Sequence, residues 1–258
     1  MTAFEGERRY QAVVDFTKSK MNGFSYKEWN DYFSRNDKQR LKIDFSKEEN
    51  FPEAVKKRIF PSVKAFQRGE GSDGGYLMET AEVFAQGYKV PEYKETMKQF
   101  IREENWHSAY LKTYMNFHHV PVKERSFLDR VFRKLRRLGG LRCEVTVLVT
   151  AEMIALTYYD ALSKNTDSAA LKSICAQMLH DEIPHVMFQS YTLSHFKNNL
   201  PDKWMRIILM EVTLLFVWGA FCNVYRAGGY DFGTFLKENM GYLHQSMELA
   251  DRKPAMPG

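Results

Sequence analysis

The stretch REENWH at positions 102–107 places Glu104 three residues before His107, and the stretch LHDEIPH at positions 179–185 places Glu182 three residues before His185. Residues three apart lie on the same face of an α-helix, so each pair can present a carboxylate and an imidazole to one point. Of the seven histidines in the chain, only these two follow a glutamate at this spacing. The two stretches therefore predict two halves of one metal site, carried by two different helices.

The sequence around these stretches predicts an all-α protein. Apolar residues recur with helical periodicity over long segments, and runs typical of strands are scarce. We expect a four-helix bundle with additional N-terminal and C-terminal helices, in the ranges 26–34, 51–84, 91–117, 123–162 and 168–197, and in segments after 201 and after 229. The composition of the Gly-rich segment 69–75, taken alone, predicts a loop that interrupts the first bundle helix. Residues 1–50 would form an arm or cap, 51–200 the bundle, and 201–258 accessory helices packed on it.

The bulk composition is that of an ordinary globular chain, with 44% hydrophobic and 27% charged residues among 258. The three cysteines, Cys143, Cys175 and Cys222, form no CxxC pair, which disfavours a zinc ribbon and a disulfide framework. No secretory leader opens the sequence, so we expect a cytoplasmic protein. The apolar run Ile207–Tyr225 is long enough to span a bilayer, but it contains Glu211. We therefore expect a buried helix there and no membrane span.

Much of the net charge of +5 falls in the segment 123–142, where apolar residues recur at helical spacing. This pattern predicts a basic amphipathic helix. Its outer face either is simply solvated or docks an acidic partner, such as an acyl carrier protein or anionic lipid. No nucleic-acid recognition motif accompanies the charge, so we expect no nucleic-acid partner.

A site for two metal ions needs one further carboxylate from each of the other two bundle helices. On the third helix, Glu152 lies in an apolar run, where an unpaired charge would be costly. Glu152 precedes the turn at Lys164 by 12 residues, and Glu182 follows Ser168 by 14. An antiparallel hairpin would therefore place both carboxylates about 20 Å from the turn, at similar depth.

The first bundle helix offers three acidic residues at the matching depth, namely Glu70, Asp73 and Glu79. The length of the loop that follows this helix leaves all three within range. We favour Glu70, which lies 34 residues before Glu104. This choice would make the neighbouring glycines helix-interior residues that permit a close approach, instead of a loop.

The residue types indicate which metal such a site would hold. The zinc-peptidase motif HExxH is absent, and a site rich in carboxylates with one histidine per ion suits iron or manganese. Two divalent cations would neutralise the four buried carboxylates, so metal binding and folding should be coupled. Asp181, directly before Glu182, either accepts the free ring N–H of a ligand histidine or is a plain exposed acid.

With these residues in place, the chain resembles the ferritin-like di-iron carboxylate superfamily over about Ala65–Ser190. The motif EENWH is similar to the second-helix motif of acyl-carrier-protein desaturases and of ribonucleotide reductase small subunits, and DEIPH is similar to their fourth-helix motif. The stretch KAFQRGEGS at positions 64–72 resembles the first-helix stretch of rubrerythrins, in which a Gly-Glu step supplies a carboxylate. The resemblance supports Glu70.

The resemblance implies a pair of iron ions, with a mixed iron–manganese centre as the alternative. In this family, Glu70 and Glu152 would be terminal or bridging ligands, Glu104 and Glu182 would help to bridge, and His107 and His185 would complete one ligand set per ion. Such centres use ferrous iron to reduce dioxygen and oxidise a substrate. The chain departs from the family at Leu111, where radical-forming reductase subunits have tyrosine, and it lacks the CxxC electron relay of rubrerythrins. A separate electron donor would be required.

Three functions follow as expectations. The first is a di-iron oxidase or oxygenase that acts on an organic, apolar or acyl substrate, with the apolar fifth helix either walling a channel or burying a core or homodimer face. The second is an iron-handling or peroxide-detoxifying protein, although the long N-terminal arm argues against a simple ferritin cage. The third is an interaction protein that keeps a structural metal and uses the segment 123–142.

Overall fold

The computed structural model describes residues 14–49, 51–71, 74–122 and 139–252. Within these ranges the protein is helical and contains no strand, so the prediction of an all-α protein is confirmed. The α-helices are α1 (Tyr26–Asn36), α2 (Glu53–Glu70), α3 (Gly75–Tyr88), α4 (Glu92–Phe117), α6 (Gly140–Lys164), α7 (Ala169–Leu193), α8 (Leu200–Ala227) and α9 (Phe232–Asp251). Two short 3-10 helices, η1 (Phe16–Lys18) and η2 (Lys20–Gly23), precede α1.

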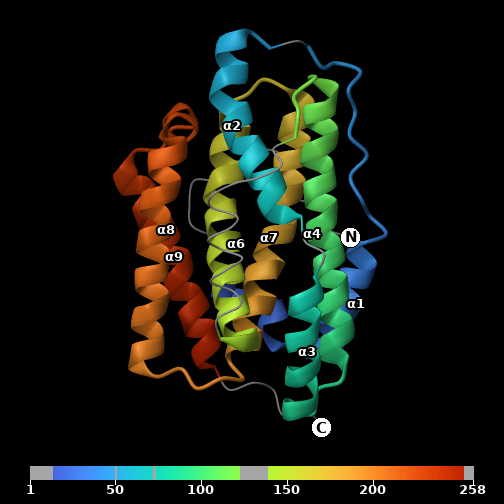
Figure 1. Ribbon diagram of the computed structural model, residues 1–258, viewed down its shortest axis with the longest axis vertical. Coiled ribbons are helices and arrows are strands. Elements are labelled where there is room, and N and C mark those ends of the chain that lie inside the picture. The colour runs from blue at the N-terminus through green and yellow to red at the C-terminus, as the bar shows by residue number, and fades with distance from the viewer. Residues whose placement is uncertain (1–13, 50, 72–73, 123–138, 253–258) are drawn as a thin grey trace.

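The centre of the molecule is a bundle in which α6 and α7 form a hairpin and α4 packs on α7. In Figure 1, α2 covers the upper half of this bundle and α3 the lower half, so that together they occupy the place of one long helix. Helix α1 packs on α4 at one side, and α8 and α9 pack on the α6–α7 hairpin at the other. The chain thus surrounds α6 and α7 with other helices on most sides.

The predicted first bundle helix is divided into α2 and α3, which corrects the expectation that its glycines lie inside one helix. Helix α2 ends at Glu70 and α3 begins at Gly75. Gly74, between them, has a φ of 70°, in the left-handed region that favours glycine. A Cβ at Gly74 would also lie 2.8 Å from Cδ1 of Ile101 on α4. The backbone conformation and the close approach of α4 together explain why the residue before α3 is a glycine.

The other helix boundaries follow local signals in the sequence. Ser168 is the N-cap of α7, because its Oγ accepts a hydrogen bond of 2.9 Å from the backbone N–H of Leu171. Helix α7 runs through Pro184 without a break. Helix α6 begins at Gly140, and most of the basic segment predicted at 123–142 lies outside the described residues. At Gly228, after α8, a Cβ would lie 2.4 Å from the carbonyl oxygen of Ala161, so only glycine allows this contact with α6.

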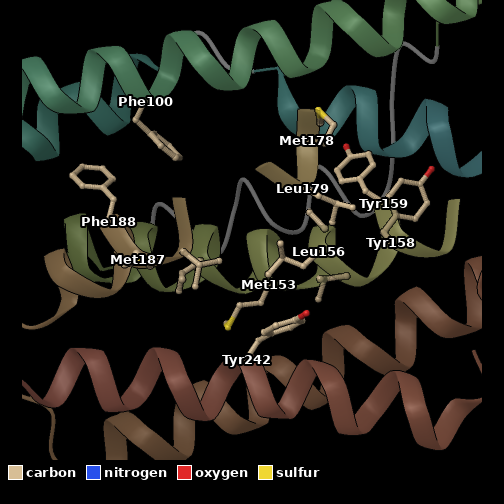
Figure 2. Close-up of a cluster of buried hydrophobic side chains, with 14 of the residues drawn as sticks. Phe100, Met153, Leu156, Tyr158, Tyr159, Met178, Leu179, Met187, Phe188 and Tyr242 are labelled. Carbon is tan, nitrogen blue, oxygen red and sulfur yellow. The ribbon is translucent and has the colours of Figure 1, made fainter. Parts of the chain in front are cut away.

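The core is built from aromatic and aliphatic side chains of the bundle helices and of α9. Figure 2 shows Phe100 of α4 facing Phe188 of α7, with ring centroids 5.9 Å apart. On the other side of α6, Met153 lies beside Tyr242 of α9. Both regions exclude water from the middle of the bundle, where the predicted metal ligands lie.

Two of the described helices, α6 and α8, are long and apolar enough to cross a bilayer by length and composition alone. They differ in burial, because 89% of the apolar window of α6 is buried but only 28% of that of α8. The expectation that the run Ile207–Tyr225 is a buried helix is therefore wrong for most of its residues. Its inner side packs on α6, α9 and α2, and its outer side is exposed.

Candidate metal centre

The six residues expected to bind metal all lie inside the bundle. They come from four helices, α2, α4, α6 and α7, and each is at most 8% exposed. The residues are Glu70, Glu104, His107, Glu152, Glu182 and His185. Of the two alternatives for the first helix, Glu79 is exposed on α3, and Asp73 lies outside the described residues. Glu70 is therefore the acid of this region that the structure places in the interior.

Four of these residues form a compact group, because one ligand atom from each of Glu104, His107, Glu182 and His185 lies within 4.8 Å of all the others. Nδ1 of His107 lies 3.5 Å from Glu104 Oε1 and 3.4 Å from Glu182 Oε1. Nδ1 of His185 lies 2.9 Å from the same Glu104 oxygen and 3.6 Å from Glu182 Oε2. Each of the two glutamates thus faces both imidazoles, and Glu182 presents a different oxygen to each.

The remaining two glutamates come from two further helices, α6 and α2. Oε2 of Glu152 lies 3.7 Å from Nδ1 of His185. Glu70 is the last residue of α2, and its Oε1 accepts a hydrogen bond of 2.6 Å from the hydroxyl of Tyr159 on α6. The structure therefore places Glu152 beside His185 and holds Glu70 against Tyr159 of α6.

The outer nitrogens of the two histidines are held by acids from the opposite motif. Nε2 of His107 on α4 lies 3.1 Å from Asp181 Oδ2 on α7, the contact that the sequence suggested. Nε2 of His185 on α7 lies 2.9 Å from Glu103 Oε2 on α4. The amide of Asn36, at the end of α1, donates to both acids, to Asp181 Oδ1 at 2.8 Å and to Glu103 Oε1. One side chain of the N-terminal arm thus connects the supports of both histidines.

Glu103 and Asn36 are residues that sequence reasoning missed. A signal for Glu103 was present, because both motifs read acid, glutamate, two residues, histidine: Glu103 precedes Glu104 as Asp181 precedes Glu182. No motif in the sequence points to Asn36, since it lies 67 residues before Glu103 and outside the bundle.

The hydrogen bonds of the histidines determine which ring nitrogen is free. An imidazole that donates its Nε2 proton to a carboxylate carries a lone pair on Nδ1. Nδ1 of both histidines, Oε1 of Glu104 and both oxygens of Glu182 are buried and have no hydrogen-bond partner. Buried acceptors that face one another are unfavourable unless a cation or protons lie between them. The donor set therefore fits a bound cation.

Without a cation, protons must take its place. Burial, followed by the charges of Glu104 and Glu182, raises the pKa of Glu70 and of Glu152 well above the usual value. Burial by itself would lower the pKa of both histidines, but their hydrogen bonds to acids and the surrounding carboxylates raise it well above the usual value. The pKa of Glu182 is lowered although burial raises it, because its close contacts with Glu152 and with the two histidine rings favour its charged form. Metal binding would replace these protons.

The buried Glu/His group can therefore hold a metal ion.

Comparison of the chain with protein-family models, with curated proteins and with solved structures found no match.

Proposed function

We propose that the chain is a ferritin-like di-iron oxidase or oxygenase, which activates dioxygen to oxidise a small organic substrate of apolar or acyl character and receives electrons from a separate donor. The observation that supports this proposal best is the convergence of unpartnered acceptor atoms from α4 and α7 between the flanking carboxylates of α2 and α6. Di-metal carboxylate bundles take their ligands from four helices. Two of the helices supply one glutamate each, and the other two supply a Glu-x-x-His pair each. Four carboxylates and two imidazoles suit iron or manganese better than zinc.

The distances suggest how two ions would share these ligands. Glu104 and Glu182 would bridge, because each faces both histidines. His185 with Glu152 would complete one ligand set, which leaves His107 and Glu70 to complete the other. Two divalent cations would bring the formal charge of the four carboxylates to zero, which removes the cost of burying them unpaired. In the ferrous form, the bound iron would supply electrons for the reduction of dioxygen.

The residues around the centre favour a dry site with a controlled supply of protons. The ring of Phe100 lies 4.8 Å from that of His185, and the ring of Phe33 lies 5.8 Å from it, centroid to centroid. These side chains exclude water on the His185 side and favour an apolar substrate. On the other side, the hydroxyl of Tyr159 donates a hydrogen bond of 2.6 Å to Glu70. Tyr159 is thus placed to keep that carboxylate oriented.

The proposal is tested by adding ferrous iron anaerobically to the metal-free protein and then admitting dioxygen. We expect two ions per chain by metal analysis, followed by oxygen consumption faster than that of ferrous iron in buffer. Glu182→Gln, which removes one shared carboxylate and keeps the side-chain size, should abolish the protein-dependent oxygen uptake. The exposed Glu79→Gln should not change it.

Two results would contradict the proposal. One is wild-type protein that binds no iron, or binds it without any oxygen uptake above the buffer rate. The other is a large particle that takes up many ions per chain, which would favour iron storage. If neither result is found, product analysis with fatty acids and acyl esters of increasing chain length would identify the substrate class.

A further inference from the structure

Helix α8 carries an exposed apolar surface that the proposed metal centre does not explain. Of the twelve large hydrophobic side chains that are exposed in the described ranges, seven lie on this helix. Six of them form one surface, here named the α8 strip, and are 44–62% exposed: Trp204, Met205, Ile208, Val212, Leu215 and Phe216. Their spacing repeats with the helical period, so they follow one side of the helix. In Figure 1, α8 lies at the outer edge of the molecule.

The inner side of the same helix is firmly held by the rest of the molecule. Met210 and Leu214 are fully buried, and the buried guanidinium of Arg206 donates a hydrogen bond of 2.6 Å to Ser246 on α9. The non-helical backbone at Phe221 comes after the strip, so residues 204–220 form regular helix. The strip is therefore a rigid surface, which suits association without rearrangement.

The size of the strip matches an interface. A large side chain covers on the order of 200 Å² when it is buried completely, so six side chains at about half exposure offer roughly 600 Å² of apolar surface. One partner in a standard protein interface contributes about 800 Å². The strip with its small neighbours reaches this range along a single helix. Such a narrow, straight surface fits another helix.

The order of large and small residues along α8 makes the strip complementary to itself in the antiparallel direction. If a two-fold axis passes through Val212, Ile208 of one copy lies opposite Phe216 of the other. Trp204 and Met205 then lie opposite the exposed small residues Ala220 and Gly219. A parallel pair would instead place tryptophan against tryptophan and glycine against glycine. The antiparallel pair thus fills its volume more evenly, as a symmetric interface requires.

The exposed acid within the described residues 204–220 of α8 also favours a second helix over lipid. Glu211 is exposed and lies 100° around the helix from Val212, at the edge of the strip. Between two helices this edge stays open to water, whereas membrane hydrocarbon that covered the strip would also approach the carboxylate. We propose that the protein forms a two-fold symmetric dimer in which the α8 strips of two copies pack antiparallel.

The first test is sedimentation velocity of the full chain over about 1–50 µM. The wild type should sediment at twice the chain mass of 30.3 kDa. The double variant Ile208→Glu with Phe216→Glu should raise the dimer dissociation constant at least about 100-fold, because each substitution removes a contact at the centre of the interface. Val83→Glu is the matched control, since Val83 is 71% exposed on α3. Circular dichroism should show the same helix content in all three proteins, because the substituted positions are exposed.

The second test places a cysteine on the inferred two-fold axis. In a background of Cys143→Ser and Cys222→Ser, with Cys175 left buried, Val212→Cys should form a covalent dimer under mild oxidation, and Val83→Cys should not. A monomeric wild type, or a dimer that persists in the double variant, would overturn the proposal. So would a monomer that binds phosphatidylglycerol vesicles through the strip, which would make α8 a membrane-binding helix.

Discussion

Replacing Asp181 with asparagine should weaken metal binding at the proposed ion position of His107. Asp181 accepts four hydrogen bonds, two on each oxygen: from Asn36 and His180 on Oδ1, both at 2.8 Å, and from His107 at 3.1 Å and Gln177 at 2.8 Å on Oδ2. These donors keep the pKa of Asp181 well below the usual range although burial raises it. The carboxylate thus remains charged and fixes the Nε2 proton of His107.

The expected magnitude follows from this hydrogen-bond pattern. Asparagine has one oxygen and one NH₂ group, so either pair of donors must face another donor. If the NH₂ group faces His107, the ring must move its proton to Nδ1 to accept the bond, and Nδ1 can then no longer bind metal. A hydrogen bond to a charged group contributes about 1.5–3 kcal/mol. At 1.4 kcal/mol per tenfold change, this corresponds to a loss of about 10- to 100-fold in metal affinity.

Anaerobic calorimetric titration with ferrous iron, together with metal analysis after gel filtration, measures this loss. Asp31→Asn is the matched control, because Asp31 is an exposed acid on α1. Glu103→Gln should cause a similar loss at the other ion, through His185. If Asp181→Asn binds both ions as tightly as the wild type, or no worse than Asp31→Asn does, then the contact with Asp181 does not orient a metal ligand.

Three further predictions concern the remaining ligands. Glu70→Ala should lower the metal content, measured by metal analysis, to at most one ion per chain, and the control Glu79→Ala should leave it unchanged. Equal metal contents in the two variants would exclude Glu70 as a ligand. Tyr159→Phe removes the hydrogen bond of 2.6 Å to Glu70 and should weaken metal binding by about 1 kcal/mol, and an unchanged titration would contradict this role. The raised pKa values of Glu70, Glu152 and the two histidines mean that their protonated forms stabilise the metal-free fold, so this stability is lost as pH rises. Between about pH 5 and pH 8, where Glu182 stays ionised, the melting temperature of the metal-free protein should fall with rising pH. Over the same range, the increase in melting temperature caused by added metal should grow. A metal-free melting temperature that rises with pH would refute this.

The parts of the fold that local chemistry determines could be predicted from the sequence. The range expected for the second bundle helix, 91–117, agrees with α4 at Glu92–Phe117, and the helix expected to begin at 168 agrees with α7, whose N-cap is Ser168. The division between α2 and α3 depends on how closely Ile101 of α4 approaches Gly74, and this distance is a tertiary property. The exposure of α8 could not be predicted for the same reason, because periodicity identifies a helix but not the neighbour that covers it.

The candidate site shows the same limit. The spacing within each motif brings a carboxylate and an imidazole to one point, and the length of the α6–α7 hairpin brings Glu152 to the level of His185. Counting residues from the following loop left Glu70, Asp73 and Glu79 all in range, so Glu70 was favoured by its separation of 34 residues from Glu104 and supported by the resemblance. Asn36 could not have been predicted, since only the packed structure shows which surface of α4 the arm covers.

The crossed support of the two histidines has a consequence for how the centre fills. The acid that orients each imidazole belongs to the helix that carries the other imidazole, and Asn36 joins the two acids. An ion that enters either position therefore stiffens groups on both α4 and α7, and the second ion meets ligands that are already in place. The pair should load cooperatively, and neither motif should retain a well-ordered single-ion site when the other is removed.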